Sequence, residues 1–302
     1  MRPIPARPRH QQRGVVLVAV LWIAAALVLI VAGIGSSAKG EVRSADGFRQ
    51  RIAATALADG AIMLAARDLA AAATPTNAPV AGAYRVDGRP VAVEASPSSG
   101  WVNLNAAGRE LLQAMLMIRA GLVERDAVRL AAAIVDWRDL DQMPQGDGGE
   151  DEAYQAAGSP YRPFNGGFQT PEDLLQVLGM SFDVFDSIKD CIAVTGADGG
   201  GVNPMAAPVE VLQILTGGDA RLAEAIAARR AEGDPLLDLS ALDGRFIDRA
   251  PAASYRLEAQ VALPDGRRLS RVLWLRVNRA RRGAGAVTVL RRDPVTVRSG
   301  DV

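Results

Sequence analysis

The hydrophobic and polar positions of the chain fall into distinct patterns. Residues 15–38 run for 24 positions without a charged side chain and are mostly apolar. Because about 20 apolar residues in a helix cross the roughly 30 Å hydrocarbon core of a bilayer, this run predicts a transmembrane helix. From Lys39 to Ala73 apolar residues recur near helical spacing and proline is absent, so the helix is expected to continue beyond the membrane.

Alternating apolar and polar residues appear in two places far apart in the chain. They surround the turn signals Asp87-Gly88 and Pro264-Asp265-Gly266, and each pattern predicts a β-hairpin. The residues between the hairpins read almost entirely as helix. The predicted fold class is therefore α+β: a long N-terminal helix packs on a small antiparallel sheet, as in pilins, and a large all-α domain is inserted between the strands.

The helical middle of the chain contains an internal repeat. Residues 102–115 (VNLNAAGRELLQAM) and 202–215 (VNPMAAPVEVLQIL) are identical at 7 of 14 positions. Further along, RLAAAI at 129–134 is echoed by RLAEAI at 221–226. Each unit reads as a helix, a short turn and a second helix. Such a helix-turn-helix repeat suits either DNA binding or a structural scaffold.

Charge distribution separates these two readings of the repeat. The chain has 34 basic and 34 acidic side chains, but residues 101–250 hold 12 Lys/Arg against 24 Asp/Glu, a net charge of −12 that leaves +12 for the remainder. Phosphate binding needs clustered basic side chains. The acidic excess therefore favours a scaffold, and no nucleic-acid partner is expected.

Side chains for nucleophilic catalysis are scarce. The one histidine, His10, precedes the apolar run, and Cys191 is the one cysteine. Histidine-dependent triads and His-ligated zinc are therefore excluded from the part of the chain beyond the apolar run. A single cysteine also excludes an intramolecular disulfide. We expect a protein that is not an enzyme, with Cys191 as a small buried residue.

The densest polar segment is Asp136–Tyr154, which holds seven carboxylates among flexible glycines. Carboxylates on a tight loop repel one another unless a cation lies among them, and irregularly spaced oxygen ligands suit Ca²⁺. The spacing does not match the EF-hand loop. A solvated acidic loop remains an alternative, as does a carboxylate pair for acid–base catalysis in a membrane-tethered hydrolase.

The N-terminus reads as a short basic leader. Residues 1–14 contain four arginines and no acid. Positive charge before an apolar run holds the N-terminus in the cytoplasm, so the bulk of the chain is predicted on the far side of the membrane. The junction Arg13-Gly14-Val15 resembles the prepilin peptidase site, where cleavage follows the glycine and Val15 would become the first mature residue. An ordinary signal anchor is the alternative.

Together these motifs resemble the minor pseudopilin K family of type II secretion systems. The resemblance rests on the basic leader with Gly14, the VLVAVLW start of the apolar run, VNLNAA, AIVDWRDLD followed by GGEDEAY, SPYRPFNGGFQTPEDLLQVLGM and VNPMAA. It implies cleavage and N-terminal methylation by a prepilin peptidase, and a bacterial inner-membrane protein with a periplasmic C-terminal domain. It also implies assembly at a pseudopilus tip with minor pseudopilins of the I, J and H types.

The resemblance further implies bound Ca²⁺, which we place at Asp139, Asp141, Glu150 and Asp151. Most pilins have glutamate at the fifth mature position, where it pairs with the N-terminal amine of the subunit assembled before it. Here that position is Ala19. A subunit that enters first has no predecessor, so alanine fits a tip subunit. Val15 departs from the more usual Phe or Met.

The predicted domain organisation has five parts. They are a basic leader (1–14), a transmembrane part of the N-terminal helix (15–38), a pilin-like α/β domain (39–102 and 251–278), an inserted α-domain with helix-turn-helix repeats (103–250) and a basic flexible tail (279–302). The predicted function is to initiate and cap the pseudopilus during protein export across the outer membrane. The alternative is a signal-anchored extracytoplasmic binding module with helix-hairpin-helix-like repeats that recognises DNA or a polysaccharide.

Overall fold

The structure is a computed structural model of the whole chain. Its backbone is described at residues 13–141, 143, 146, 149–195, 199–234, 236–250, 252–281 and 283–299. The side chains of residues 13–15, 29–44 and 284 lie outside the described set. The chain divides into two units, residues 1–54 and 55–302, and each is described by itself.

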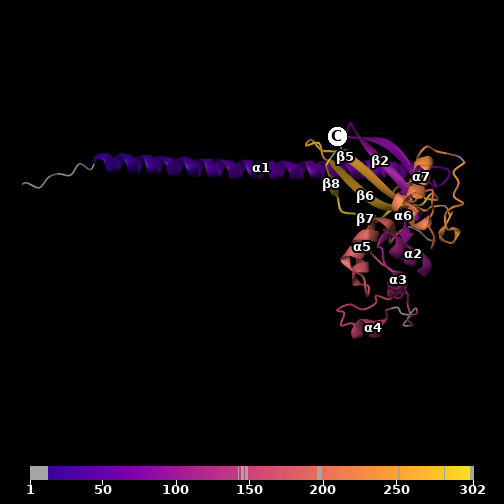
Figure 1. Cartoon of the computed structure of the whole chain (residues 1–302). Coiled ribbons are helices and arrows are strands. Elements are labelled where there is room, and N and C mark those ends of the chain that lie inside the picture. The colour runs from indigo at the N-terminus through magenta and orange to yellow at the C-terminus, as the bar shows by residue number, and fades with distance from the viewer. Residues whose placement is uncertain are drawn as a thin grey trace, which may run out of the picture. The chain divides into compact units, whose positions relative to one another are not determined.

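The first unit contains the beginning of helix α1 (Arg13–Ala71), whose last turns belong to the second unit (Figure 1). The helix is continuous through Gly40 and Gly47. The side chains of residues 16–28 are exposed, including Trp22 at 73%. Over the residues that the structure describes, none of the helices combines the length and apolarity needed to span a membrane. The predicted leader falls mostly on residues 1–12, outside the described residues.

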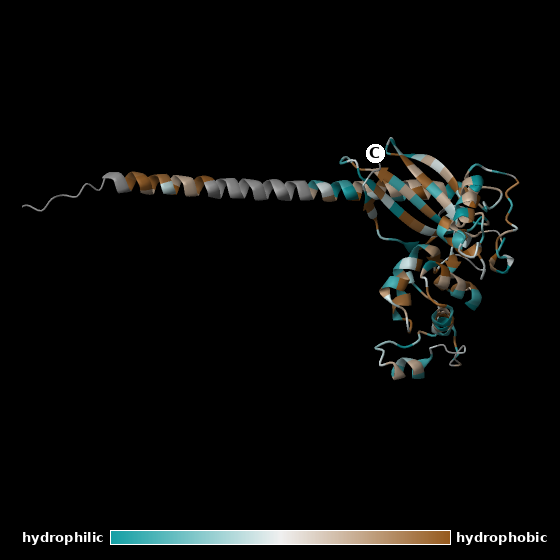
Figure 2. Ribbon diagram, viewed as in Figure 1, coloured by the Kyte–Doolittle hydropathy of each residue, from teal (hydrophilic) through white to brown (hydrophobic). Residues whose placement is uncertain are grey.

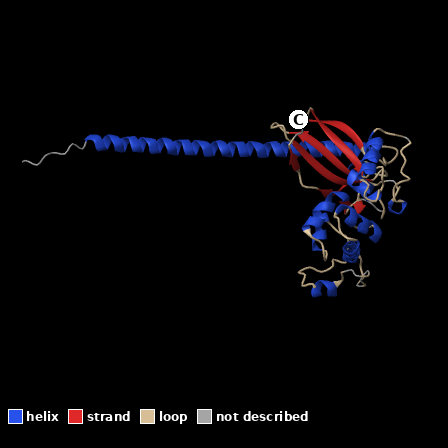
Figure 3. Ribbon diagram, in the orientation of Figure 1, coloured by secondary structure: helices blue, strands red, loops and turns tan. Residues whose placement is uncertain are grey.

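The second unit is built on an antiparallel sheet in the order β1–β2–β5–β6–β7, with β8 also pairing β6 (Figure 3). Hydrophobic and hydrophilic residues alternate along these strands in Figure 2, as the two-residue period of a sheet requires. Both predicted hairpins are present. The strand bounds are β1 (Val80–Val86), β2 (Arg89–Pro97), β5 (Ser254–Ala262), β6 (Arg268–Val277), β7 (Val287–Arg292) and β8 (Thr296–Arg298).

The last turns of α1 pack on the sheet through small side chains. Ala58, Ala61 and Ile62 are fully buried, and alanine lets a helix approach a sheet closely. An ion pair fixes the contact, because Arg271 Nε on β6 donates to Asp59 Oδ1 on α1 at 2.8 Å. The fold is thus a mixture of helix and antiparallel sheet, as the sequence predicts.

Helices are the main regular elements of the chain between β2 and β5, which has its own buried cluster of apolar residues. Cys191 lies fully buried there, and its burial raises the pKa of the thiol to about 11. The elements are η1 (Ser98–Gly100), β3 (Val102–Asn103), α2 (Arg109–Arg119), α3 (Glu124–Arg138), α4 (Asp151–Ala156), η2 (Pro171–Gln176), α5 (Phe182–Ile188), η3 (Lys189–Cys191), β4 (Ile192–Ala193), α6 (Val209–Leu215), α7 (Ala220–Ala231) and η4 (Gly244–Phe246).

The two copies of the repeat form matching structures, α2–α3 and α6–α7. In each copy an asparagine side chain holds the loop that precedes the first helix. Asn103 Oδ1 accepts a hydrogen bond from the backbone N–H of Asn105, and Asn203 Oδ1 accepts one from the backbone N–H of Met205, both at 3.0 Å. The hydrogen-bonded asparagines lie 100 residues apart, the same offset as the sequence repeat.

An arginine closes each repeat unit. Arg138, the last residue of α3, donates to the carbonyls of Leu104 and Ala107, the latter at 2.6 Å. Arg230 on α7 donates to the carbonyls of Pro204 and Ala207 at 2.8 and 2.7 Å. We call Arg138 and Arg230 the clamp arginines. Sequence analysis missed them, although each stands nine residues after the arginine that begins its RLAxAI echo.

The prediction of a flexible tail over 279–302 is wrong for the residues that the structure describes. The segment forms η5 (Gly283–Ala286), β7 and β8, and both strands pair with β6. Asp293 anchors it, because its carboxylate accepts from Trp274 Nε1 at 3.0 Å and its carbonyl from Arg271 Nη1 at 2.8 Å. The strands have only six and three residues, too short for alternation to be visible in sequence. Residues 300–302 lie outside the described residues.

Candidate metal centre

A group of three carboxylates lies where α3 ends and α4 begins. Asp139 immediately follows the last residue of α3, Asp141 comes two residues later, and Glu150 immediately precedes α4. The two helix ends thus bring together residues that are eleven positions apart in the chain. One carboxylate oxygen from each of the three lies within 4.8 Å of the others. This group is called the acidic cluster below.

The acidic cluster is short of hydrogen-bond donors. Glu150 is 7% exposed, and within the part of the chain that the structure describes, both of its Oε atoms and Asp139 Oδ1 are buried without a donor. Asp136 beneath them is fully buried, and its Oδ2 accepts from the backbone of Gly149 at 2.8 Å. Buried carboxylate oxygens without donors are costly, so this arrangement calls for a positive charge.

The electrostatics of the cluster lead to the same conclusion. Burial, followed by the charges of Asp136, Asp139 and Asp141, raises the pKa of Glu150 to about 7. Burial and the neighbouring Asp141 and Asp136 also raise the pKa of Asp139. A divalent cation held by oxygen ligands would relieve both the burial and the mutual repulsion. The three side chains therefore fit a hard cation such as Ca²⁺.

The fourth predicted ligand does not join this group. Asp151 is the first residue of α4 and is half-buried, but the acidic cluster of described residues consists of Asp139, Asp141 and Glu150. Asp147, in the same acidic segment, lies outside the described residues. As a first-turn acid, Asp151 instead complements the positive end of the helix dipole.

The predicted processing residues lie in the first unit. Gly14 and Val15 have helical backbone at the start of α1, and the side chain of Val15 lies outside the described set. Ala19 is exposed on the same helix.

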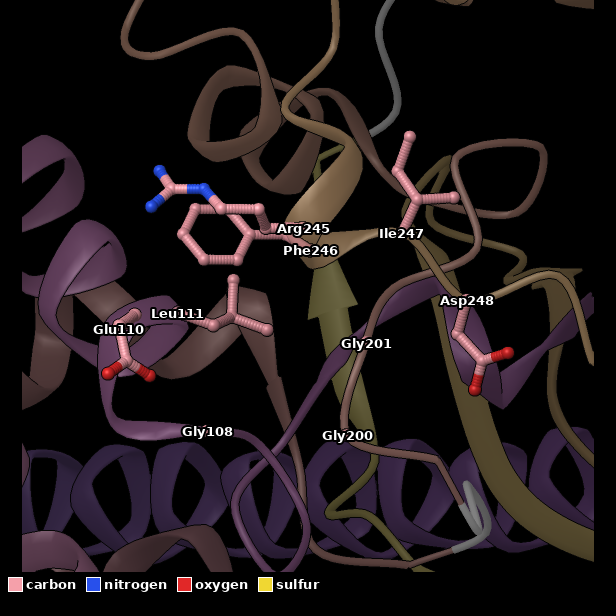
Figure 4. A pocket seen from close by; sticks show the side chains of 9 residues that line it. All are labelled: Gly108, Glu110, Leu111, Gly200, Gly201, Arg245, Phe246, Ile247 and Asp248. Carbon is pink, nitrogen blue, oxygen red and sulfur yellow. The ribbon is translucent and has the colours of Figure 1, made fainter.

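A pocket of about 450 Å³ lies apart from the acidic cluster, at the start of α2 (Figure 4). Glu110 and Asp248 face it from opposite sides, with Leu111 and Phe246 between them. Its cation, Arg245, is already paired, because Nη2 donates to Asp243 Oδ2 at 2.6 Å. Asp248 Oδ1 accepts from the backbone of Ala250 at 2.8 Å.

Known proteins share sequence similarity with the middle of the chain. Residues 97–197, which include the acidic cluster, match the family described as type II secretion system (T2SS), protein K. A stretch of 77 residues is 30% identical to the type II secretion system protein K of Pectobacterium carotovorum subsp. carotovorum, covering 26% of this chain and 24% of that relative. The middle third of the chain is thus similar to the protein K family of type II secretion systems. The match spans about a quarter of the curated relative's length.

The fold of the chain is also similar to a solved structure. The similar chain comes from the crystal structure of the GspK–GspI–GspJ complex of the enterotoxigenic Escherichia coli type 2 secretion system. The alignment covers 84% of this chain and 98% of that chain, with a TM-score of 0.54 and 18% sequence identity. At this identity the similarity establishes the fold.

Proposed function

We propose that the chain is a minor pseudopilin at the tip of the type II secretion pseudopilus, where it initiates and caps assembly during protein export across the outer membrane. The protein K family match over residues 97–197 carries this proposal. The solved relative was crystallised as a GspK–GspI–GspJ complex, which supports the I and J types as partners. The resemblance noted in the sequence adds the H type.

The proposed mechanism is packing rather than catalysis. The chain sits in the inner membrane through residues 15–38, with the second unit in the periplasm. The N-terminal helix bundles with the helices of neighbouring subunits, and the helical segment between β2 and β5 obstructs a subunit that would dock above it. Ala19 supports entry as the first subunit, because such a subunit has no preceding N-terminal amine to pair with.

Cleavage after Gly14 is the step that tests this function. We expect mass spectrometry of the membrane-derived protein to find Val15 as a methylated first residue. Gly14→Val should leave residues 1–14 attached and should abolish secretion in a host with a working prepilin peptidase. Ala6→Val, within the leader but away from the junction, is the matched control. An intact leader on the functional wild-type protein would refute the proposal.

We further propose that the acidic cluster binds Ca²⁺ through Asp139, Asp141 and Glu150. The donor-free buried oxygens support this, and Ca²⁺ takes additional oxygens from backbone or water. The bound ion would tie the end of α3 to the start of α4 and would stabilise the fold there. The role proposed for the ion is structural.

A further inference from the structure

The two edges of the sheet are built differently. At one edge β6 pairs with the short strands β7 and β8, the β6–β7 register shifts at Trp274, and exposed arginines stand on both strands. Short strands, irregular register and edge charges are the devices that keep a sheet from pairing with another chain. This edge is therefore protected.

Strand β1 forms the opposite edge, and of these devices it has a single exposed charge. It is seven residues long, it pairs with β2 in unbroken register from Val80 to Val86, and it contains no proline. Arg85 is its only charged residue, and among the described residues it takes part in no ion pair. A regularly paired and largely apolar edge is a template for an added strand.

The turn after β1 determines which backbone groups are free to accept that strand. Asp87 and Gly88 have φ angles of 51° and 73°, as in a two-residue type I′ turn. The residues that flank such a turn, Val86 and Arg89, form a hydrogen-bonded pair. Hydrogen-bonded and non-hydrogen-bonded pairs alternate along an antiparallel strand. The even-numbered residues of β1 therefore form the backbone hydrogen bonds to β2. Ala81, Ala83 and Arg85 direct their N–H and C=O groups outward.

A pocket of about 370 Å³ adjoins this edge. Leu69 of α1 and Ala72, just after the helix, line it together with Val80, Gly82 and Tyr84 of β1. Gly82 contributes no side chain of its own, and the Tyr84 ring lies beside it, since a Cβ at Gly82 would stand 3.2 Å from Tyr84 Cε2. A residue of an added strand opposite Gly82 would point into this pocket, and an apolar side chain suits its lining.

We propose that β1 accepts an added β-strand from a partner subunit of the assembly. The incoming segment is extended, carries an apolar side chain that enters the pocket beside Gly82, and carries an acidic residue that pairs with Arg85. The backbone hydrogen bonds supply affinity, and the pocket and Arg85 supply selectivity. This inference rests on the proposed function, because it takes the partner to be another pseudopilin.

Ala83→Pro in the full chain tests the proposal. Proline removes the outward N–H of residue 83 without removing a β1–β2 hydrogen bond, and edge strands tolerate proline with that orientation. We expect its affinity for the cognate I- and J-type subunits to fall at least tenfold, with an unchanged melting temperature. Ala83→Ser, which keeps the N–H, is the matched control and should bind like the wild type.

Hydrogen exchange in the wild-type complex gives a second readout that does not depend on the variant folding. The amides of Ala81, Ala83 and Arg85 should exchange rapidly in the free chain and slowly in the complex, whereas those of Gly82 and Tyr84 should be slow in both. Strand addition would be overturned if Ala83→Pro bound with wild-type affinity, or if the amides of residues 81, 83 and 85 stayed unprotected in the complex. Either result would leave the proposed function standing.

Two other results would have different consequences. If the wild-type chain binds neither subunit, the proposed function is refuted. The proposal that another pseudopilin supplies the added strand is then refuted as well. If the wild-type chain instead forms a dimer that Ala83→Pro abolishes, the edge pairs with a second copy, and the proposed partner is wrong.

Discussion

At the scale of single residues, each clamp arginine joins the second helix of its repeat unit to the loop before the first helix. Each guanidinium donates to two backbone carbonyls, and burial lowers the pKa of both groups. Hydrogen bonds from a charged donor are worth about 1.5–3 kcal/mol each, and a carbonyl left unpaired in the interior carries a further penalty. The clamps therefore rank among the stabilising contacts of the repeats.

Replacing a clamp arginine should destabilise the fold. We expect Arg230→Met to lower the free energy of unfolding by about 2–4 kcal/mol, because both the Pro204 and Ala207 carbonyls lose their charged donor. Denaturant titration followed by circular dichroism measures this. Arg129→Met on the exposed face of α3 is the control and should change stability by less than about 0.5 kcal/mol. If the two substitutions lowered the free energy of unfolding equally, the stabilising role of the clamp arginine would be contradicted.

Glu150 is the residue whose ionisation should be visible in stability. Its pKa is raised from 4.5 to about 7 in the folded chain, so between these values the folded state holds a proton that the unfolded state has lost. In chelator, stability should therefore fall as the pH rises through this window, and Glu150→Gln should flatten the dependence. Thermal melts at successive pH values measure it. The assignment would be contradicted if the stability of the wild type, but not that of Glu150→Gln, rose from pH 5 to pH 7.

Adding Ca²⁺ should reverse the loss of stability at neutral pH. At a hundred times the dissociation constant a bound ligand adds about 2.7 kcal/mol, and the gain should be larger at pH 7.5 than at pH 5 because the ligands must be deprotonated. Glu152→Gln, an exposed acid on α4, should keep the response, whereas Glu150→Gln should lose it. Identical melting of chelated and Ca²⁺-loaded wild type would exclude the ion.

At the scale of elements, β7 and β8 complete the sheet rather than trailing from it. Arg291 on β7 lies over the Trp274 ring at 4.9 Å from its centroid and pairs with Asp293 Oδ1 at 2.7 Å. Arg291, one of the basic residues that make this segment look like a tail, thus packs on β6.

Removing these strands should weaken the whole sheet. A chain that ends after Ala286 loses the contacts of Asp293 with Trp274 and Arg271 and leaves the edge of β6 uncovered. We expect a clearly lower melting temperature and aggregation on heating, measured by calorimetry and light scattering. A chain that lacks only residues 300–302 is the control and should melt like the wild type. Unchanged melting of the shorter chain would restore the flexible-tail interpretation.

The success of sequence analysis differed among elements for physical reasons. The hairpins were predictable because a two-residue turn signal such as Asp87-Gly88 acts locally. The acidic cluster was visible as a dense run of carboxylates, but the sequence does not show where the helix begins, and Glu150 lies just before α4 whereas Asp151 is its first residue. The clamp arginines were missed because their acceptors are backbone carbonyls more than twenty residues away.

At the scale of the whole second unit, a seam joins the sheet to the helical segment. The rings of Trp101 and Trp274 on β6 meet edge to face at 5.4 Å, and Ser98 Oγ of η1 donates to the carbonyl of Ser254 on β5 at 3.0 Å. At Gly100 of the same η1, the chain approaches the loop before α6 so closely that a Cβ would lie 2.3 Å from the carbonyl oxygen of Ala206. Such contact couples the unfolding of both parts.

Gly100→Ala should therefore destabilise the sheet and the helices together. Overpacking costs about 1–3 kcal/mol, and here the obstructing atoms belong to the backbone, which yields least. We expect calorimetry to show one transition for residues 55–302, shifted to lower temperature. Gly244→Ala, where a Cβ meets nothing within 4 Å, is the control. Two separate transitions in the wild type would show that the seam does not couple the parts.

The clamp arginines also bear on how the helical segment arose. The two units share the loop asparagine, the arginine and half of the residues in 102–115 and 202–215, as units that arose by duplication would. The residue that follows the arginine is Asp139 in the first copy and Ala231 in the second. Since an arginine clamp closes either copy, the clamp does not depend on the carboxylate beside it, and the position after the arginine can be acidic in one copy and apolar in the other.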